Sequence, residues 1–125
     1  MSEAIGIRQE ITDNPLANTG DYRRRAVFML DGRFDAGNAD AVKEALKQTI
    51  GSGVRQVVVD MTQVPFIDSA GLSTLVSALK MSRRAGGDVV LAGVQPQTLT
   101  VFSLTMLDKV FAIYPTCQSA LDSLR

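Results

Sequence analysis

The chain divides into short apolar runs and longer stretches in which apolar residues recur every third or fourth position. The apolar runs predict strands at residues 4–11, 22–30, 54–61, 88–92 and 110–114. Residues 4–11 alternate only loosely between apolar and polar side chains, which indicates a strand at the edge of a sheet. Residues 54–61 and the second half of 22–30 are continuously apolar, which favours the middle of a sheet.

Helical periodicity fills most of the remaining chain. It predicts a helix over residues 36–50 that a Gly-Ser-Gly sequence ends, and a longer helix that ends near Arg84. Shorter helices are expected at residues 97–104 and 116–124, the last one capped by Thr116. The core-facing positions predicted for the first two helices are Ala39, Val42, Leu46, Ile50, Leu72, Leu75, Val76 and Leu79.

The order of these elements, two strands followed by alternating helices and strands, predicts an α/β fold. Strands joined through helices run parallel, so the central sheet should be mixed but mostly parallel, with an antiparallel or edge strand from the N-terminus. We expect about four helices around this sheet. A chain of 125 residues is the usual length of one domain, and we expect a single domain over residues 1–125.

The overall charge and hydropathy exclude several classes of partner. Thirteen basic and thirteen acidic residues cancel, so no net field attracts nucleic acid or an anionic membrane. No apolar run approaches the ~20 residues that span a bilayer, and the N-terminus has no signal-peptide pattern. The single Cys117 cannot form an internal disulfide, as is common in a reducing compartment. We therefore expect a cytoplasmic protein with no direct nucleic-acid or membrane partner.

The residue types that the chain lacks exclude several kinds of chemistry. With no histidine, there is no Ser-His-Asp triad, no histidine phosphorelay site and no histidine-ligated metal. One cysteine cannot form a cysteine cluster for zinc or iron–sulfur. Neither of the two common glycine-rich phosphate loops is present. The sequence gives no reason to expect a cofactor or a metal.

One segment has the character of a functional site, namely Asp68-Ser69-Ala70-Gly71, which follows a buried strand and a short Pro-containing loop. It opens a helix, where unpaired amides and the helix dipole favour negative charge. A phosphate on Ser69 would add about −1.5 to −2 charges there, which the fold tolerates but a partner that buries the turn does not. We expect Gly71 to keep the surface low for a kinase. The alternative is that Asp68 or Ser69 is simply the helix N-cap.

Residues 58–72, Val-Val-Asp-Met-Thr-Gln-Val-Pro-Phe-Ile-Asp-Ser-Ala-Gly-Leu, resemble the signature of the STAS family, in particular the bacterial anti-sigma factor antagonists. The resemblance extends over residues 22–124, nearly the whole chain. Four further segments follow the family pattern in order, at residues 30–35, 86–94, 105–111 and 116–121. Several such matches at the right spacing are far more specific than one.

The resemblance implies a STAS fold and a binding function. Family members of this type bind an anti-sigma factor that is also a serine kinase, and so release a sigma factor for transcription. The kinase phosphorylates the serine of the Asp-Ser turn, and a PP2C-type phosphatase removes the phosphate. By position, Ser69 would be the phosphoacceptor, and Asp35, Asp68, Ala70 and Gly71 would complete the switch surface.

The family pattern carries further expectations. The free protein is expected to be a monomer or a weak dimer, and any nucleotide would belong to the partner kinase. Ala70 stands where many relatives have a second serine, which leaves Ser69 as the only hydroxyl within the turn. Thr74, one helical turn further on and expected to be exposed, is an open candidate for a second acceptor.

Three other interpretations remain open. A STAS domain can serve as a scaffold subunit in a stressosome-like or other partner-switching complex. An enzyme with Ser69 as nucleophile would need a base, which without histidine would have to be a lysine or a carboxylate, and the lysines are predicted to be solvated. The apolar residues of the predicted helix at 97–104 and just after it form either a docking surface or plain core. The lysines considered as the base are Lys43, Lys47, Lys80 and Lys109. The residues considered as a docking surface are Phe102, Leu104, Met106 and Leu107.

Overall fold

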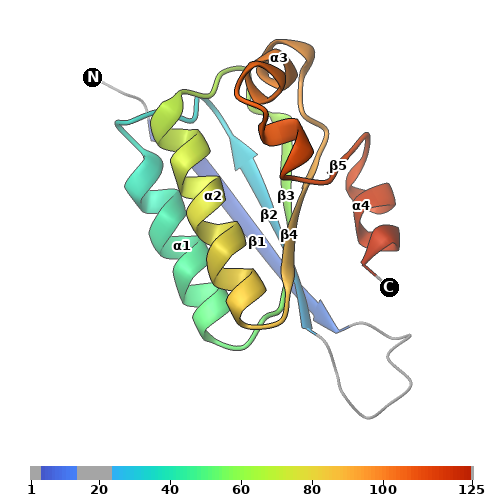
Figure 1. Cartoon of the computed structure of the whole chain (residues 1–125). Helices are drawn as coiled ribbons and strands as arrows, with labels where there is room; N and C mark the ends of the chain where they lie inside the picture. The colour runs from blue at the N-terminus through green and yellow to red at the C-terminus, as the bar shows by residue number, and fades with distance from the viewer. Residues whose placement is uncertain (1–3, 14–23, 125) are drawn as a thin grey trace.

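A computed structural model describes residues 4–13 and 24–124; the sequences Asn14-Pro15 and Asn18-Thr19-Gly20, which predict turns, lie outside this part of the chain. Figure 1 shows a central sheet with two long helices lying side by side on one face. The elements in chain order are β1 (Gly6–Asp13), β2 (Arg24–Asp31), α1 (Ala39–Gly51), β3 (Gln56–Gln63), α2 (Ser69–Arg84), β4 (Asp88–Ala92), α3 (Pro96–Leu104), the 3-10 turn η1 (Leu107–Lys109), β5 (Ile113–Tyr114) and α4 (Cys117–Ser123).

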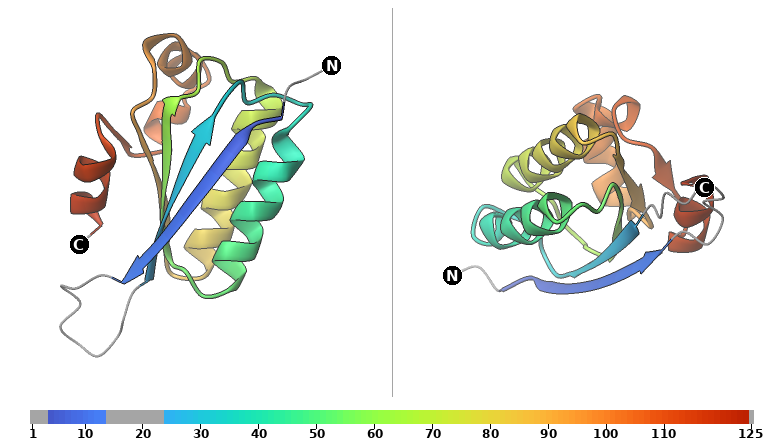
Figure 2. Two further views of the ribbon diagram at one scale, coloured as in Figure 1. Left: turned by 180° about the vertical axis from the view of Figure 1, so that it is seen from behind. Right: turned by 90° about the horizontal axis from the view of Figure 1, so that it is seen from below.

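The sheet has the order β1-β2-β3-β4-β5. β1 pairs antiparallel with β2, and the other three pairings are parallel. The predicted mixed, mostly parallel sheet with an antiparallel N-terminal edge strand is therefore confirmed. Helices α1 and α2 cover one face of the sheet and α4 packs on the opposite face, while α3 lies at one end (Figures 1 and 2).

The apolar run of β3 is buried because both of its faces are covered. Val57 and Val59 belong to the core under α1 and α2, and Val58 between them belongs to the smaller core under α4. All three side chains are fully buried. A strand with helices on both faces is expected to be continuously apolar, and this is the pattern that the sequence shows.

The two long helices pack through the positions that their periodicity predicts. Seven of the eight predicted core-facing residues are buried, and only Val76 is half-buried at the margin of the core. α1 begins at Ala39 rather than at residue 36. The side chain of Asn38 closes a turn ahead of the helix, accepting from the amide of Asp35 (3.0 Å) and donating to the carbonyl of Arg33 (2.7 Å). This local turn replaces the first turn of the predicted helix.

The C-terminal third differs from the prediction at one point. The strand expected over residues 110–114 is limited to Ile113–Tyr114, and Val110 is exposed. Met106 has a left-handed backbone (φ 63°), and η1 follows it, with the amide of Phe111 bonded to the carbonyl of Leu107. These turns occupy the residues that would have lengthened the strand. α3 and α4 form where expected, and Thr116 caps α4 by accepting from the amide of Ser119.

Cys117, at the start of α4, is half-buried against the sheet. Burial raises the pKa of its thiol, and the negative charges of Asp60 and Glu10 raise it further. A thiol with a raised pKa stays protonated at neutral pH and is a weak nucleophile. Cys117 therefore contributes apolar contacts to the smaller core rather than reactivity.

Candidate functional site

The predicted site lies where two loops meet at the carboxyl ends of β2 and β3. The amide of Phe34 donates to the carbonyl of Phe66 (2.9 Å), and the amide of Asp68 donates to the carbonyl of Phe34 (3.2 Å). These bonds form an isolated parallel bridge between Phe34 and Ile67. The bridge brings Asp35, next to Phe34, beside the start of α2, as the family resemblance implied.

The carboxylate of Asp68 ties the start of α2 to the neighbouring loop. Oδ1 accepts from the amide of Gly71 (3.0 Å), which makes Asp68 the N-cap of α2. Oδ2 accepts from the amide of Ala36, also at 3.0 Å. One side chain thus fixes both the helix end and the loop that carries Asp35.

Ser69 is the first residue of α2, and its side chain is exposed. Of the two residues that could have been the N-cap of α2, Asp68 is the cap and Ser69 is not. The Ser69 side chain is therefore not needed to start the helix. Its hydroxyl makes no hydrogen bond with any residue of the described part of the chain. The hydroxyl therefore stands free at the positive end of a 16-residue helix.

Asp35 is partly exposed beside this turn, with its side chain 18% accessible. Oδ1 accepts from the amide of Gly37 (3.0 Å), and Oδ2 lies 4.0 Å from Nε of Arg33. The guanidinium of Arg33 in turn lies 4.0 Å from the centre of the Phe66 ring. The Arg33–Phe66 pair was not predicted, because residues 33 positions apart give no local sequence signal.

Gly71 is buried rather than exposed. A Cβ atom there would lie 2.7 Å from Cγ1 of Ile67 and 2.9 Å from the carbonyl oxygen of Phe34. The expectation that this glycine lowers the surface for a kinase is therefore wrong. Gly71 instead allows α2 to pack directly on the paired loops, which positions Ser69.

Thr74 is also buried, with 5% of its surface exposed, so the expectation of an exposed threonine is wrong. Together with Lys43 it lines a hollow of about 200 Å³ between α1 and α2. A kinase needs an accessible hydroxyl, and Thr74 does not present one at the surface. Ser69 is accessible, and Ala70 beside it has no hydroxyl.

The four residues of the possible docking surface divide into two groups. Phe102 is buried and meets the ring of Phe111 edge-on, and Leu107 is half-buried. Leu104, at 79% exposure, and Met106 project into solvent. The exposed apolar residues of this region, which we call the α3 patch, are Leu99, Leu104, Met106 and Val110.

Two side-chain hydrogen bonds connect α3 to the segment that precedes Asp68. The amide nitrogen of the Gln95 side chain donates to the carbonyl of Thr62 (2.7 Å), and that of Gln97 donates to the carbonyl of Pro65 (3.2 Å). α3, which carries Leu99 and Leu104 of the α3 patch, therefore lies at the same end of the molecule as the start of α2 (Figure 1), whereas the carbonyl of Val110 accepts from Arg83 in the last turn of α2 (3.4 Å).

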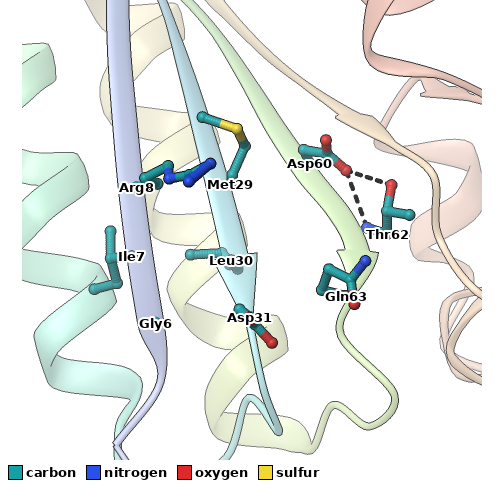
Figure 3. Close-up of a pocket in the computed structure, with 9 residues that line it drawn as sticks. All are labelled: Gly6, Ile7, Arg8, Met29, Leu30, Asp31, Asp60, Thr62 and Gln63. Atoms are coloured by element: carbon teal, nitrogen blue, oxygen red, sulfur yellow. Dashed lines mark hydrogen bonds between the residues drawn. The ribbon is translucent and has the colours of Figure 1, made fainter.

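A separate hollow of about 480 Å³ opens on the face of the sheet away from α1 and α2 (Figure 3). Its lining includes Arg8, Asp31 and Asp60, and Oδ1 of Asp60 accepts from the amide and the hydroxyl of Thr62 (3.0 and 2.5 Å). None of the predicted switch residues lines it. Within the described residues, no group of three or more acidic, cysteine or histidine side chains could hold a metal ion.

We expect Asp68→Ala to destabilise the protein by about 1–2 kcal/mol, because it removes the N-cap of α2 and leaves the amide of Ala36 without its acceptor. Thermal unfolding followed by circular dichroism measures this loss. Asp68→Asn is the matched control, since its side-chain oxygen can still cap the helix and should restore most of the stability. Equal stability of Asp68→Ala and the wild type would contradict the role of the carboxylate.

Comparison with known proteins assigns this chain to a family. The STAS domain model matches residues 17–120, and the chain belongs to the STAS domain family. Its homologues are named anti-sigma factor antagonists. The anti-sigma-B factor antagonist of Listeria monocytogenes is 34% identical over 66% of this chain and 72% of its own. The anti-sigma-F factor antagonist RsfB of Mycobacterium tuberculosis is 28% identical over 90% and 92%.

Solved structures agree with this assignment. The crystal structure of an anti-sigma factor antagonist from Mycobacterium paratuberculosis superposes with a TM-score of 0.77 at 26% identity, covering 96% of this chain and 95% of that one. The chain therefore shares both the fold and the order of its elements with this type of protein. None of the helices in the described residues is long and apolar enough to cross a membrane.

Proposed function

We propose that this protein is an anti-sigma factor antagonist whose binding is controlled by phosphorylation of Ser69. In this proposal it binds an anti-sigma factor that is also a serine kinase, and so releases a sigma factor for transcription. The kinase phosphorylates Ser69 and the complex dissociates. A PP2C-type phosphatase then removes the phosphate and restores binding.

The free hydroxyl of Ser69 is the observation that carries the proposal. It is exposed, it is not the helix cap, and it makes no hydrogen bond with a described residue, so a kinase can modify it without breaking the fold. The helix end below it favours the added charge. A partner that covers the turn would have to desolvate that charge, which is costly without a cationic counterpart.

The proposed contact surface surrounds this serine. The junction of the two paired loops carries Asp35, Asp68, Ser69 and Ala70. The buried Gly71 allows α2 to pack closely against these loops. α3 lies at the same end of the molecule, and its exposed Leu99 and Leu104 supply apolar area for a protein partner. A docked kinase would thus meet both a charge-sensitive turn and an apolar surface.

The remaining parts of the proposal concern the chain as a whole. We propose that residues 1–125 act as one STAS domain in the cytoplasm, with no cofactor and no catalytic activity of their own. The four lysines considered as bases, Lys43, Lys47, Lys80 and Lys109, are all exposed. Labelling of Ser69 by an activity-based serine probe would contradict the non-enzymatic proposal.

A pull-down from the lysate of the native organism tests the switch, with wild type, Ser69→Ala and Ser69→Glu as baits and mass spectrometry as readout. We expect the first two baits to recover a small ATP-binding serine kinase and the third to lose it. In the presence of ATP, the recovered kinase should phosphorylate the wild type but not Ser69→Ala.

Two results would contradict the proposed switch. Equal recovery of the kinase by all three baits would show that charge at Ser69 does not control binding. Recovery of a very large assembly of STAS proteins in place of a kinase would favour the alternative function, a scaffold subunit of a stressosome-like complex.

A further inference from the structure

β1 is a long and regular edge strand. It has eight residues and pairs with β2 without a bulge, from Gly6 opposite Asp31 to Asp13 opposite Arg24. Its other edge pairs with no strand among the described residues. Figure 2 shows the strand, in dark blue, along the outer margin of the sheet. Edge strands are usually protected against unwanted pairing by a proline, a bulge or charged side chains; β1 has no proline and no bulge, and its charges are those of Arg8, Glu10 and Asp13.

The side chains of β1 alternate between the two faces of the sheet. Arg8 and Glu10 stand opposite Met29 and Val27 of β2, which pack in the smaller core on the α4 side. Ile7 and Ile11 stand opposite residues of the main core, on the α1 side. Arg8, Gln9, Glu10 and Ile11 are all exposed, and Ile11 is 40% accessible. On the α1 side the Gln9 side chain donates to the hydroxyl of Thr49 (2.6 Å), while the exposed side chains of Arg8, Glu10 and Ile11 lie where a partner strand would add.

This strand is complementary to a second copy of itself. If two β1 strands pair antiparallel with Gln9 opposite Gln9, then Arg8 of each copy lies opposite Glu10 of the other. The same register places Ile7 opposite Ile11 of the second copy, on the helix face of both sheets. Opposite charges and apolar residues that face each other directly across strands are stabilising. Neither Arg8 nor Glu10 forms an ion pair with any described residue, so both charges are available.

The neighbouring registers are unfavourable. We consider only arrangements in which the helices of both copies lie on the same side of the joined sheet. The two copies are then related by a two-fold axis perpendicular to the sheet, and a residue at the axis faces the same residue of the other copy. Centring the pair on Arg8 places two arginines opposite each other, and centring it on Glu10 places two glutamates opposite each other. Like charges directly opposite each other are destabilising. Of these three registers, only the one centred on Gln9 places opposite charges opposite each other.

We propose that this protein forms a homodimer in which two β1 strands pair antiparallel about Gln9 and join the two sheets into one. The pairing covers the open edge and the exposed side of Ile11. An interface of one strand on each side is small, so association is weak and depends on concentration. The interaction follows the general mode in which a strand is added to an exposed sheet edge.

The dimer leaves the proposed switch surface accessible. Ser69 starts α2 at the carboxyl end of β3, whereas the pairing edge is the long margin of β1, with β2 between the two strands. Each dimer would therefore present two switch turns. Two linked sites can bind a partner of matching symmetry more tightly than one site can. This consequence rests on the proposed function, while the dimer itself does not.

Sedimentation equilibrium of the full chain, from micromolar to near-millimolar concentration, tests the dimer against the monomer mass of 13.4 kDa. We expect the wild type to approach twice this mass as its concentration rises. Arg8→Glu and Glu10→Arg each place like charges opposite each other at both pairs. We expect each to weaken association by about tenfold or more.

The double variant Arg8→Glu with Glu10→Arg is the matched control, because it restores opposite charges with their positions exchanged. We expect it to associate about as strongly as the wild type, and thermal melts should show that all three variants remain folded. A wild type that stays monomeric throughout would overturn the proposal, and so would single variants that associate as well as the wild type. A double variant as weak as the single ones would overturn the register. Since Ser69→Glu should leave association unchanged, this proposal and the proposed switch can fail separately.

Discussion

Ser69→Glu is expected to weaken binding to the proposed partner kinase by at least about thirtyfold, which corresponds to ~2 kcal/mol. The exposed hydroxyl becomes a carboxylate that the docked partner must bury, and no cation of the described switch surface stands ready to pair with it. Arg33, the basic residue of the neighbouring loop, lies over the ring of Phe66 and near Asp35. Isothermal titration calorimetry with the purified kinase measures the change.

The same variant should keep its melting temperature. A negative charge in the first turn of a helix is favourable by about 0.3–1 kcal/mol, so Ser69→Glu should be at least as stable as the wild type. Ser69→Ala is the matched control, because it removes the hydroxyl without adding charge and should bind like the wild type. A large loss of stability in Ser69→Glu would contradict the account of the helix end, and wild-type affinity would contradict the switch.

Gly71→Ala should destabilise the fold by about 1–3 kcal/mol, despite the better helix propensity of alanine. The new methyl group would meet Cγ1 of Ile67 at 2.7 Å and the carbonyl oxygen of Phe34 at 2.9 Å. That carbonyl cannot easily move away, since it accepts from the amide of Asp68 and the amide of Phe34 is bonded as well. Urea unfolding gives the change in free energy.

Gly51→Ala is the matched control for this substitution. Gly51 is the last residue of α1, and a Cβ atom there would have no neighbour within 4 Å. The same chemical change should therefore stabilise the protein by about 0.5–1 kcal/mol. A loss of stability in Gly51→Ala as large as that in Gly71→Ala would show that contact with the paired loops is not the cause.

The parts of the fold that the sequence predicted are those with a local signal. Apolar spacing located α1 and α2 to within three residues, and the continuous valines of β3 indicated a strand covered on both faces. The Pro at the start of α3 and the cap at Thr116 were equally local. The Asp-Ser-Ala-Gly turn was found in the same way, because a buried strand followed by capping residues is visible in the sequence itself.

The parts that could not be predicted depend on contacts between distant residues. Gly71 and Thr74 were expected at the surface but are buried. Their burial results from the packing of α2 on the Phe34 loop and on α1, which the local sequence does not show. The left-handed backbone of Met106, which precedes η1 and the shortened β5, had no signal because methionine has no preference for that conformation. The pairing of Phe34 with Ile67 likewise joins residues 33 positions apart.

The division of roles between Asp68 and Ser69 has a kinetic consequence. In the proposed switch the serine would gain or lose a phosphate without any hydrogen bond of the described structure having to open first, because the aspartate alone caps the helix. No slow rearrangement within this domain would then precede either reaction. The response time of the switch would be set by how often the modifying enzymes encounter the turn and how fast they act on it.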